Sequence, residues 1–215
     1  MLIDHWPLLG LRLRTARLEL RLPGEGDLAA LADLAAQGVH APDERPFLTP
    51  WTEGTPAEVA RRVVQGHWGR LGDWQPDGWS LGLAAFLDGE AVGVQGIRAR
   101  DFGVRREVTT SSWLGLAYHG RGLGTESRHA ALALVFAGLG GVSATTEAFE
   151  DNHASMGVSR KLGYRPDGIS RDVLDGKVVV SRRLRLSRED WERSDRPPVE
   201  IEGVDRCLEL FGAAE

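Results

Sequence analysis

A glycine-rich stretch between a strand pattern and a helix pattern decides the fold: Trp113-Leu-Gly-Leu-Ala-Tyr-His-Gly-Arg-Gly-Leu-Gly-Thr-Glu126. Gly120, Gly122 and Gly124 have no Cβ, so the backbone can turn tightly and approach a ligand closely. A helix rich in Ala and Leu follows at once, and the first N–H groups of a helix have no partner within it and carry the positive end of its dipole. Such a loop suits a phosphate or pyrophosphate. Taken alone, the pattern fits a tight connection equally well.

Two other glycine-loop interpretations are disfavoured. Thr125 follows Gly124 with no lysine, so the Gly-x-x-x-x-Gly-Lys-Ser/Thr phosphate loop is absent. A dinucleotide fold would place the loop near the start of a strand–helix series with an acid about 20 residues further on. Here the loop lies past the middle of the chain, after a hairpin pattern.

Outward from this loop, strand and helix patterns alternate. Thr55-Pro56-Ala57-Glu58 is typical of a helix start, and Asp88-Gly89 and Asp175-Gly176 are typical of tight hairpin turns. Strands are predicted over 11–21, 80–87, 91–98, 108–116, 142–149, 164–174 and 177–186, with helices after Asp27, over 56–71, after the glycine loop and over 154–162. This order predicts a mixed sheet with helices on both faces.

Composition and charge set broad limits. The 215 residues suffice for one ordinary domain, and 42% apolar with 27% charged residues is typical of a globular protein with a core. A net charge of −5 argues against non-specific nucleic-acid binding. No apolar run reaches the roughly 20 residues of a membrane span, and no secretory signal pattern follows Met1. With one cysteine, Cys207, and no Cys/His cluster, we expect a cytoplasmic protein without a metal, a membrane partner or a nucleic-acid partner.

Two further motifs give the glycine loop its context. Asn152-His-Ala-Ser155 and Lys161-Leu-Gly-Tyr164 follow it at a spacing that, together with Thr125-Glu126, resembles the GNAT superfamily of acyl-CoA-dependent N-acyltransferases, in its RimJ/RimL-like branch. The resemblance covers roughly residues 12–186. It implies an α/β (α+β mixed) fold with a splayed, mostly antiparallel sheet of six to seven strands. We therefore expect a GNAT domain over 1–186 and a C-terminal extension over 187–215.

The resemblance also implies how a cofactor, acetyl-CoA or another acyl-CoA, would bind. Its pantetheine arm would lie where the sheet splays and pair with main-chain groups of Leu114, Gly115 and Leu116. Its pyrophosphate would rest on the N–H groups of the loop residues, which are Gly120, Arg121, Gly122, Leu123, Gly124 and Thr125. His119 stands where the family usually has Gln or Arg, so a side-chain contact there differs.

Catalytic roles are assigned within the same resemblance. Asn152 would contact the pantetheine, and Ser155, near the thioester sulfur, could give a proton to the leaving thiolate; alternatively, Ser155 only satisfies the start of its own helix. Ser159 stands where many members have a tyrosine acid. Glu147 is the first candidate for the base that accepts a proton from the amine. The remaining candidates are Glu107, His40, Asp43, Glu44 and a chain of waters.

The acceptor and the tail are less defined. The family places the acceptor beside the loop 38–55 and the helix 56–71, where Asp43, Glu44 and Glu53 would suit a cationic amine and Trp51 could line the pocket. The acceptor is a small molecule or a protein N-terminus, and the acyl group is acetyl or, alternatively, a carboxylated chain such as succinyl. A non-catalytic acyl-CoA-binding regulator is the other function to weigh. Residues 187–215 either contact a second copy in a homo-oligomer or pack back on their own chain.

Overall fold

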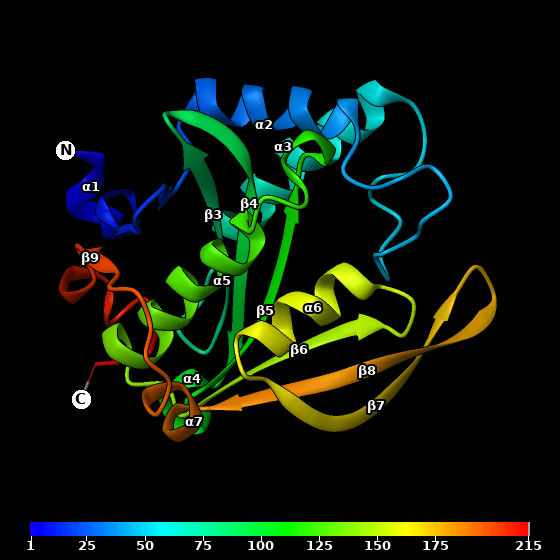
Figure 1. Ribbon diagram of the computed structural model, residues 1–215. Coiled ribbons are helices and arrows are strands. Elements are labelled where there is room, and N and C mark those ends of the chain that lie inside the picture. The colour runs from blue at the N-terminus through cyan, green and yellow to red at the C-terminus, as the bar shows by residue number, and fades with distance from the viewer. Residues whose placement is uncertain (215) are drawn as a thin grey trace.

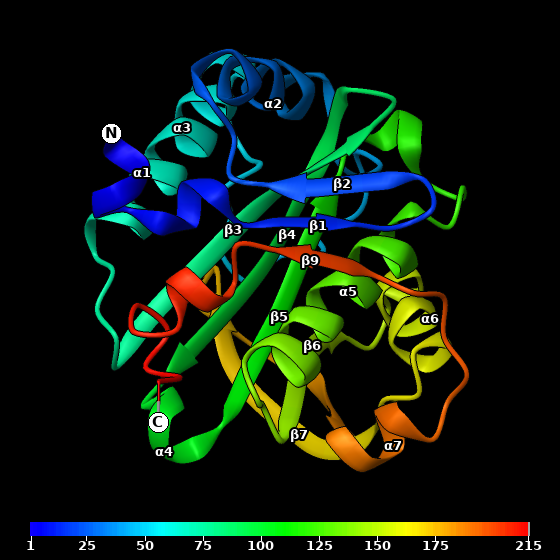
Figure 2. The ribbon, with the colours of Figure 1, turned by 90° about the vertical axis from the view of Figure 1, so that its left-hand side faces the viewer.

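The structure, a computed structural model, describes residues 1–214 as one nine-stranded sheet with helices packed on both faces (Figures 1 and 2). The helices are α1 (Leu2–His5), α2 (Glu25–Gln37), α3 (Pro56–Gly72), α4 (Phe102–Arg105), α5 (Leu123–Ala133), α6 (His153–Lys161) and α7 (Arg188–Glu192). The strands are β1 (Arg12–Arg14), β2 (Leu18–Arg21), β3 (Gly78–Leu87), β4 (Glu90–Arg100), β5 (Glu107–Leu114), β6 (Ser143–Phe149), β7 (Arg165–Leu174), β8 (Lys177–Ser187) and β9 (Glu200–Glu202). The strand order is β7-β8-β6-β5-β4-β3-β2-β1-β9.

The strand pairs are antiparallel except for β5 and β6, which run parallel. Two of the hairpins close through the predicted turns. Asp88 and Gly89 have φ of 52° and 86°, and Asp175 and Gly176 have φ of 50° and 73°. A two-residue type I′ turn requires positive φ at both central residues, which Asp-Gly tolerates at low cost. The predicted mixed α/β class and mostly antiparallel sheet are confirmed.

The predicted count of six to seven strands was too low. The segment 11–21 is not one strand but the hairpin β1–β2, because Thr15 makes a turn: its Oγ1 accepts from the N–H of Leu18 at 3.0 Å, and its own N–H donates to the Leu18 carbonyl at 2.9 Å. No Gly or Pro marks this turn in the sequence. The ninth strand, β9, is three residues long and forms by pairing with β1.

The sheet separates two cores. Leu81 and Leu83 of β3 belong to the larger cluster, which α5 covers, whereas Ala84 and Phe86 belong to a smaller cluster under α2 and α3. Successive side chains of a strand point to opposite faces, so one strand supplies both cores. We call these the α5 face and the α3 face.

The starts of α3 and α5 differ in how they are capped. Thr55 caps α3 as predicted: its hydroxyl accepts from the N–H of Glu58 at 3.3 Å, and the Glu58 carboxylate accepts from the N–H of Thr55 at 2.7 Å. By contrast, α5 begins after Gly122 with no side-chain cap. The N–H groups of its first turn are therefore left for another acceptor.

The predicted C-terminal extension packs on its own chain. Phe211 is fully buried, with its ring 5.5 Å from that of Trp74 and 4.8 Å from that of Trp79. The indole N–H of Trp79 donates to the Phe211 carbonyl at 3.0 Å. Burial in this site raises the pKa of the nearby Cys207 thiol to about 11. A contact between copies through the exposed side of the tail stays a prediction.

In the described part of the chain, none of the helices combines the length and the apolar character needed to cross a membrane.

Candidate functional site

The parallel strands β5 and β6 separate part-way along their length. They pair from Glu107 to Thr109 and from Ser143 to Thr145, and then diverge, as Figure 1 shows above α4. Side-chain hydroxyls bridge the first separated row: Thr110 donates to the Thr145 carbonyl at 3.2 Å, and Thr146 donates to the Thr110 carbonyl at 3.1 Å. We call the region beyond this row, between 111–114 and 147–149, the splay.

Leu114 turns its main-chain groups toward the splay. The N–H of Gly115 donates to the Val92 carbonyl on the β4 side at 3.0 Å, and the N–H of Leu116 donates to the Gly38 carbonyl at 3.0 Å. Peptide groups alternate in direction along a strand, so those of Leu114 point the other way. The Leu114 carbonyl lies 3.1 Å from Nε2 of His119. Of the three main-chain positions predicted to meet a pantetheine, Leu114 is the one whose N–H faces the splay.

The glycine loop holds its N–H groups open. Gly120 and Gly122 have φ of 72° and 79°, in the left-handed region that favours glycine. Among residues 1–214, no acceptor meets the N–H groups from Gly120 to Thr125; the first N–H of α5 with a partner is that of Glu126, which donates to the Gly122 carbonyl at 3.1 Å. A run of free N–H donors at the positive end of a helix dipole is suited to phosphate oxygens.

A strap from the β1–β2 turn fixes this loop. Arg17 donates from Nε to the Glu126 carboxylate at 2.7 Å and from Nη1 to the Arg121 carbonyl at 3.2 Å, while Thr15 donates to Glu126 at 2.7 Å. Partial burial raises the pKa of Glu126, but the bonds from Thr15 and Arg17 outweigh it and leave that pKa below its ordinary value. Sequence reasoning missed Arg17, because its partner lies 109 positions away.

The start of α6 presents Ser155. Asn152 caps the helix, its Oδ1 accepting from the N–H of Ser155 at 3.0 Å. The Ser155 hydroxyl is half-buried and has no hydrogen-bond partner among residues 1–214. Ser159, in contrast, is fully buried, and its hydroxyl donates to the Ser155 carbonyl at 3.0 Å. Of the two hydroxyls, that of Ser155 is the one left free to serve a ligand.

Arg128 is a buried cation that sequence reasoning missed. It is 3% exposed, and its guanidinium donates to the hydroxyls of Ser159 at 3.0 Å and Ser112 at 3.2 Å. Its Nε has no acceptor, and no carboxylate of the described residues pairs with it. Burial lowers the pKa of this group, because a charge taken out of water without an anion is destabilised. The available signal was an arginine within an Ala- and Leu-rich helix.

Glu147, the first candidate base, lies on the α3 face beyond the paired rows. It is exposed, and the hydroxyl of Ser170 donates to it at 3.1 Å. Glu107 instead lies at the end where β5 and β6 are paired, and there Ser143 donates to it at 2.7 Å and Arg185 forms an ion pair with it. Partial burial raises the pKa of Glu107, but these bonds prevail and hold it below its ordinary value. Glu107 is therefore poorly suited to take a proton near neutral pH.

The early loop is anchored over the end of β5. The ring of Trp51 lies 5.5 Å from that of Trp113, and 5.2 Å from that of Phe47. Arg45 reaches the β7–β8 turn, where it contacts Asp175 at 2.7 Å. The loop and this hairpin thus close the α3-face side of the splay, where an acceptor was predicted. Of the other candidate bases there, the His40 ring contacts the Ala41 carbonyl at 2.8 Å and the Thr52 hydroxyl at 2.9 Å.

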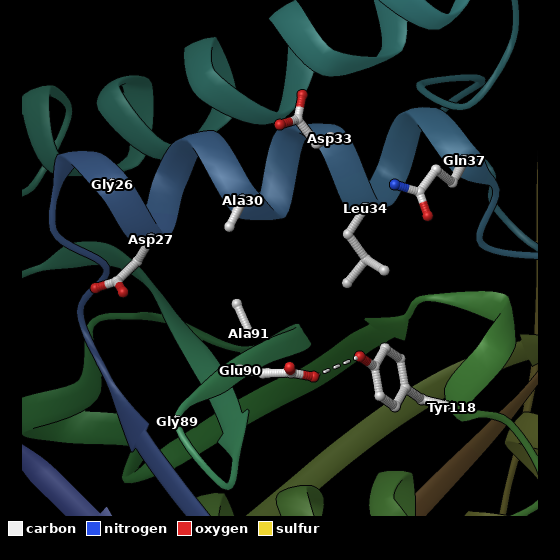
Figure 3. A pocket seen from close by; sticks show the side chains of 10 residues that line it. All are labelled: Gly26, Asp27, Ala30, Asp33, Leu34, Gln37, Gly89, Glu90, Ala91 and Tyr118. Carbon is white, nitrogen blue, oxygen red and sulfur yellow. Dashed lines mark hydrogen bonds between the residues drawn. The ribbon is translucent and has the colours of Figure 1, made fainter.

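A pocket of about 500 Å³ lies between α2 and the β3–β4 turn (Figure 3). Carboxylates of Asp27, Asp33 and Glu90 line it, and the hydroxyl of Tyr118 donates to Glu90 at 3.4 Å. Negative charge makes this pocket unsuited to phosphates. No group of three or more His, Cys, Asp or Glu side chains within residues 1–214 could hold a metal ion.

A sequence profile for the acetyltransferase (GNAT) domain matches residues 17–165. The chain belongs to the GNAT acetyltransferase family. The fold of this GNAT domain is shared with RimL, a ribosomal-protein α-N-acetyltransferase solved with coenzyme A: TM-score 0.63, 18% identity, 82% of this chain and 97% of that one covered. It is shared as well with RimJ of Mycobacterium smegmatis, solved with CoA-disulfide: TM-score 0.67, 20% identity, 93% and 91% covered. The predicted GNAT family is confirmed, and these two structures share its fold; the RimJ/RimL-like branch stays a prediction.

The GNAT motifs meet at Gly124. A Cβ on Gly124 would lie 3.6 Å from Cδ1 of Leu114 and 3.8 Å from Cγ2 of Val158. The glycine loop, the end of β5 and α6 therefore converge there. The structure brings the predicted loop, Leu114 and the Asn152–Ser155 segment to one region, whereas Glu147 approaches it from the α3 face.

Proposed function

We propose that this GNAT protein is an N-acyltransferase that moves an acyl group, most simply acetyl, from acyl-CoA to a primary amine by direct attack in a ternary complex. The observation that carries the proposal is the row of open N–H groups at Gly120–Thr125, adjacent to the Leu114 main chain that faces the splay. The open N–H groups of the loop suit an anionic pyrophosphate. The main chain of Leu114 suits an extended chain of amides.

Residues of three elements would hold the acyl-CoA. The loop from His119 to Thr125 would take the pyrophosphate, with Arg17 adding positive charge beside Arg121. The Leu114 carbonyl would accept from the pantetheine, and Asn152, whose Oδ1 caps α6, would donate to it from an amide group that has no acceptor among residues 1–214. RimL and RimJ, named above with coenzyme A or its disulfide bound, support this assignment.

Three groups would carry out the chemistry: the main-chain N–H of Leu114, the hydroxyl of Ser155 and the carboxylate of Glu147. Acyl-CoA supplies a thioester carbonyl, to which the N–H of Leu114 would donate, so that the charge developing on its oxygen is stabilised. The neutral amine forms the new C–N bond as the C–S bond breaks. The Ser155 hydroxyl would give a proton to the departing thiolate, and Glu147, directly or through water, would accept the proton that the amine loses.

Free-thiol release from acetyl-CoA over a panel of primary amines tests the proposal. Ser155→Ala should lower kcat about 100-fold, in the range expected of a general acid, with an unchanged melting temperature. Ser194→Ala, at an exposed residue two positions after the end of α7, is the matched control and should behave as wild type. Full activity of Ser155→Ala would remove that role. Binding of acetyl-CoA without turnover on any amine would favour the non-catalytic regulator instead.

One observation favours a second acyl donor, a dicarboxylic acyl-CoA such as succinyl-CoA. The buried guanidinium of Arg128 contacts Ser112 at the edge of the splay, and no carboxylate of residues 1–214 pairs with it. A carboxylate at the end of the acyl chain would supply that missing partner. Comparing kcat/KM for succinyl-CoA and acetyl-CoA distinguishes the two donors.

A further inference from the structure

A second cavity, of about 550 Å³, opens on the α3 face below the splay. It lies where the end of α3 passes over β3, β4 and β5, and guanidinium groups dominate its lining: Arg70, Arg98, Arg100 and Arg105, against the carboxylates of Asp73 and Glu107. Its volume is in the range of small-molecule sites. Glu107 is the one candidate base in its lining, whereas the glycine loop, Ser155 and Glu147 do not belong to it.

Three of these arginines have no counter-ion. Arg105 pairs with Glu107 at 3.3 Å, but Arg70, Arg98 and Arg100 take part in none of the ion pairs or side-chain hydrogen bonds of residues 1–214. The Nε of Arg70 is buried without an acceptor. Arg98 and Arg100 are exposed and lie two residues apart on the same face of β4, so they offer the cavity positive charge that no carboxylate of the described residues neutralises.

The backbone makes room for Arg70. A Cβ on Gly82 of β3 would lie 2.8 Å from Nε of Arg70, so the guanidinium rests against a strand position that has no side chain. Burial without an anion lowers the pKa of Arg70. This arginine is thus held over the sheet, on the wall of the cavity, instead of extending into water.

The cavity reaches the last paired row of β5 and β6, next to the splay. Thr109 lines it, pairs with Arg98 across β4 and β5, and contacts Thr145 of β6 hydroxyl to hydroxyl at 3.0 Å. Glu147 lies two residues beyond Thr145 on the same face. At a rise of about 3.3 Å per residue, the level of Glu147 is about 7 Å from that of Arg98 and about 13 Å from that of Arg100.

We propose that this cavity binds the anionic part of the acceptor, so that the preferred substrate is a primary amine bearing a carboxylate or phosphate group several bonds away. The inference rests on the proposed acyl transfer for the identity of its ligand, but not for the existence of the anion site. The acidic residues of the early loop suggest an acceptor with added positive charge, whereas this cavity calls for a negative group on the acceptor. One of those acidic residues, Glu53, lies 3.6 Å from Arg45 and is partly neutralised.

Phosphate binding tests the site without turnover. The protein is first saturated with CoA, so that the glycine loop is occupied, and its melting temperature is then followed against inorganic phosphate at constant ionic strength. Wild type should show a saturable rise, and the double variant Arg98→Gln/Arg100→Gln should weaken the apparent affinity at least tenfold. Arg61→Gln, an exposed arginine elsewhere on α3, is the control and should match wild type. The same phosphate response in the double variant, or no response in wild type, would overturn the proposal.

A matched pair of amines tests the substrate class. ε-Aminocaproate and its uncharged amide differ in the carboxylate alone. Wild type should acylate the carboxylate form with at least tenfold higher kcat/KM, and the double variant should lose that preference while keeping its rate on the amide. Equal rates of wild type on both amines would contradict the inference and leave the acyl transfer standing, whereas failure of the acyl transfer leaves the phosphate result to decide the anion site.

Discussion

The α5 face and the α3 face are supplied by the same strands, yet they hold positive charge in different ways. On the α5 face, Arg128 is enclosed among apolar side chains and meets two serine hydroxyls. On the α3 face, Arg98 and Arg100 project from β4 into a cavity with room for a ligand, while their neighbour Ile97 points to the α5 core. Because successive side chains of a strand point to opposite faces, Ile97 packs in the core while Arg98 and Arg100 are left available to a ligand. Substitutions should accordingly change stability on the first face and ligand affinity on the second.

The largest expected effect is a loss of stability in the α5-face core. Phe211→Ala should lower the free energy of unfolding by about 3–5 kcal/mol, because a fully buried ring packed on two tryptophans leaves a cavity. Urea denaturation measures this loss. Val104→Ala, at a residue 88% exposed, is the control and should change it by less than about 0.5 kcal/mol. A loss under about 1 kcal/mol for Phe211→Ala would show that the tail is not part of the core.

Arg128 is the exception on the α5 face, because its substitution is expected to change the choice of acyl donor without lowering stability. Arg128→Met should leave stability unchanged or raise it, because an unpaired buried charge is replaced by an apolar side chain of similar volume. If a dicarboxylic acyl chain is the donor, kcat/KM for succinyl-CoA should fall about 100-fold, with acetyl-CoA affected far less. An equal fall for both donors would assign Arg128 a positioning role instead.

A smaller effect is expected at the strap that fixes the glycine loop. The pKa of Glu126 is below its ordinary 4.5 in the folded protein, so its charged form contributes stability above that pH, and this contribution is lost as the pH falls through the lowered value. Glu126→Gln should therefore cost about 1–2 kcal/mol at pH 7. The difference from wild type should shrink in thermal melts below pH 4.5. If the difference in stability between Glu126→Gln and wild type stayed the same in strong acid, the lowered pKa of Glu126 would be contradicted.

The smallest expected change is in the stability of the α3-face arginine variants. Arg98→Gln/Arg100→Gln should alter the free energy of unfolding by less than about 0.5 kcal/mol, since both side chains are exposed and neither has a partner among the described residues. Urea denaturation alongside the phosphate titration checks this. Destabilisation by more than about 2 kcal/mol would mean that these arginines support the fold, and the contrast between the faces would fail.

Local chemistry made much of the fold predictable. Asp88-Gly89, the Thr55 cap and the glycine loop were found because residue type alone favours those backbone conformations. The β1–β2 turn was missed, because the side chain of Thr15 makes it without Gly or Pro. The three-residue β9 was missed because pairing with β1, a tertiary contact, creates it.

The candidate site divides into short motifs and long-range contacts in the same way. Leu114, the loop and Ser155 lie within motifs that are short in sequence, and the structure brings them to one region. Arg17 and Arg128 act through partners more than ten positions away, and the arginines of the α3-face cavity come from α3, β4 and α4. Neither spacing nor periodicity within one segment could reveal those contacts.

The central claim is that the glycine loop and the splay bind acyl-CoA. Thermal denaturation with CoA, acetyl-CoA and succinyl-CoA at equal, saturating concentration tests it most directly, because a ligand that binds only the folded state raises the melting temperature according to its affinity. We predict that all three raise it, and that the larger shift of the two acyl forms identifies the donor. No shift with any of the three would reduce the glycine loop to a tight turn and contradict the account.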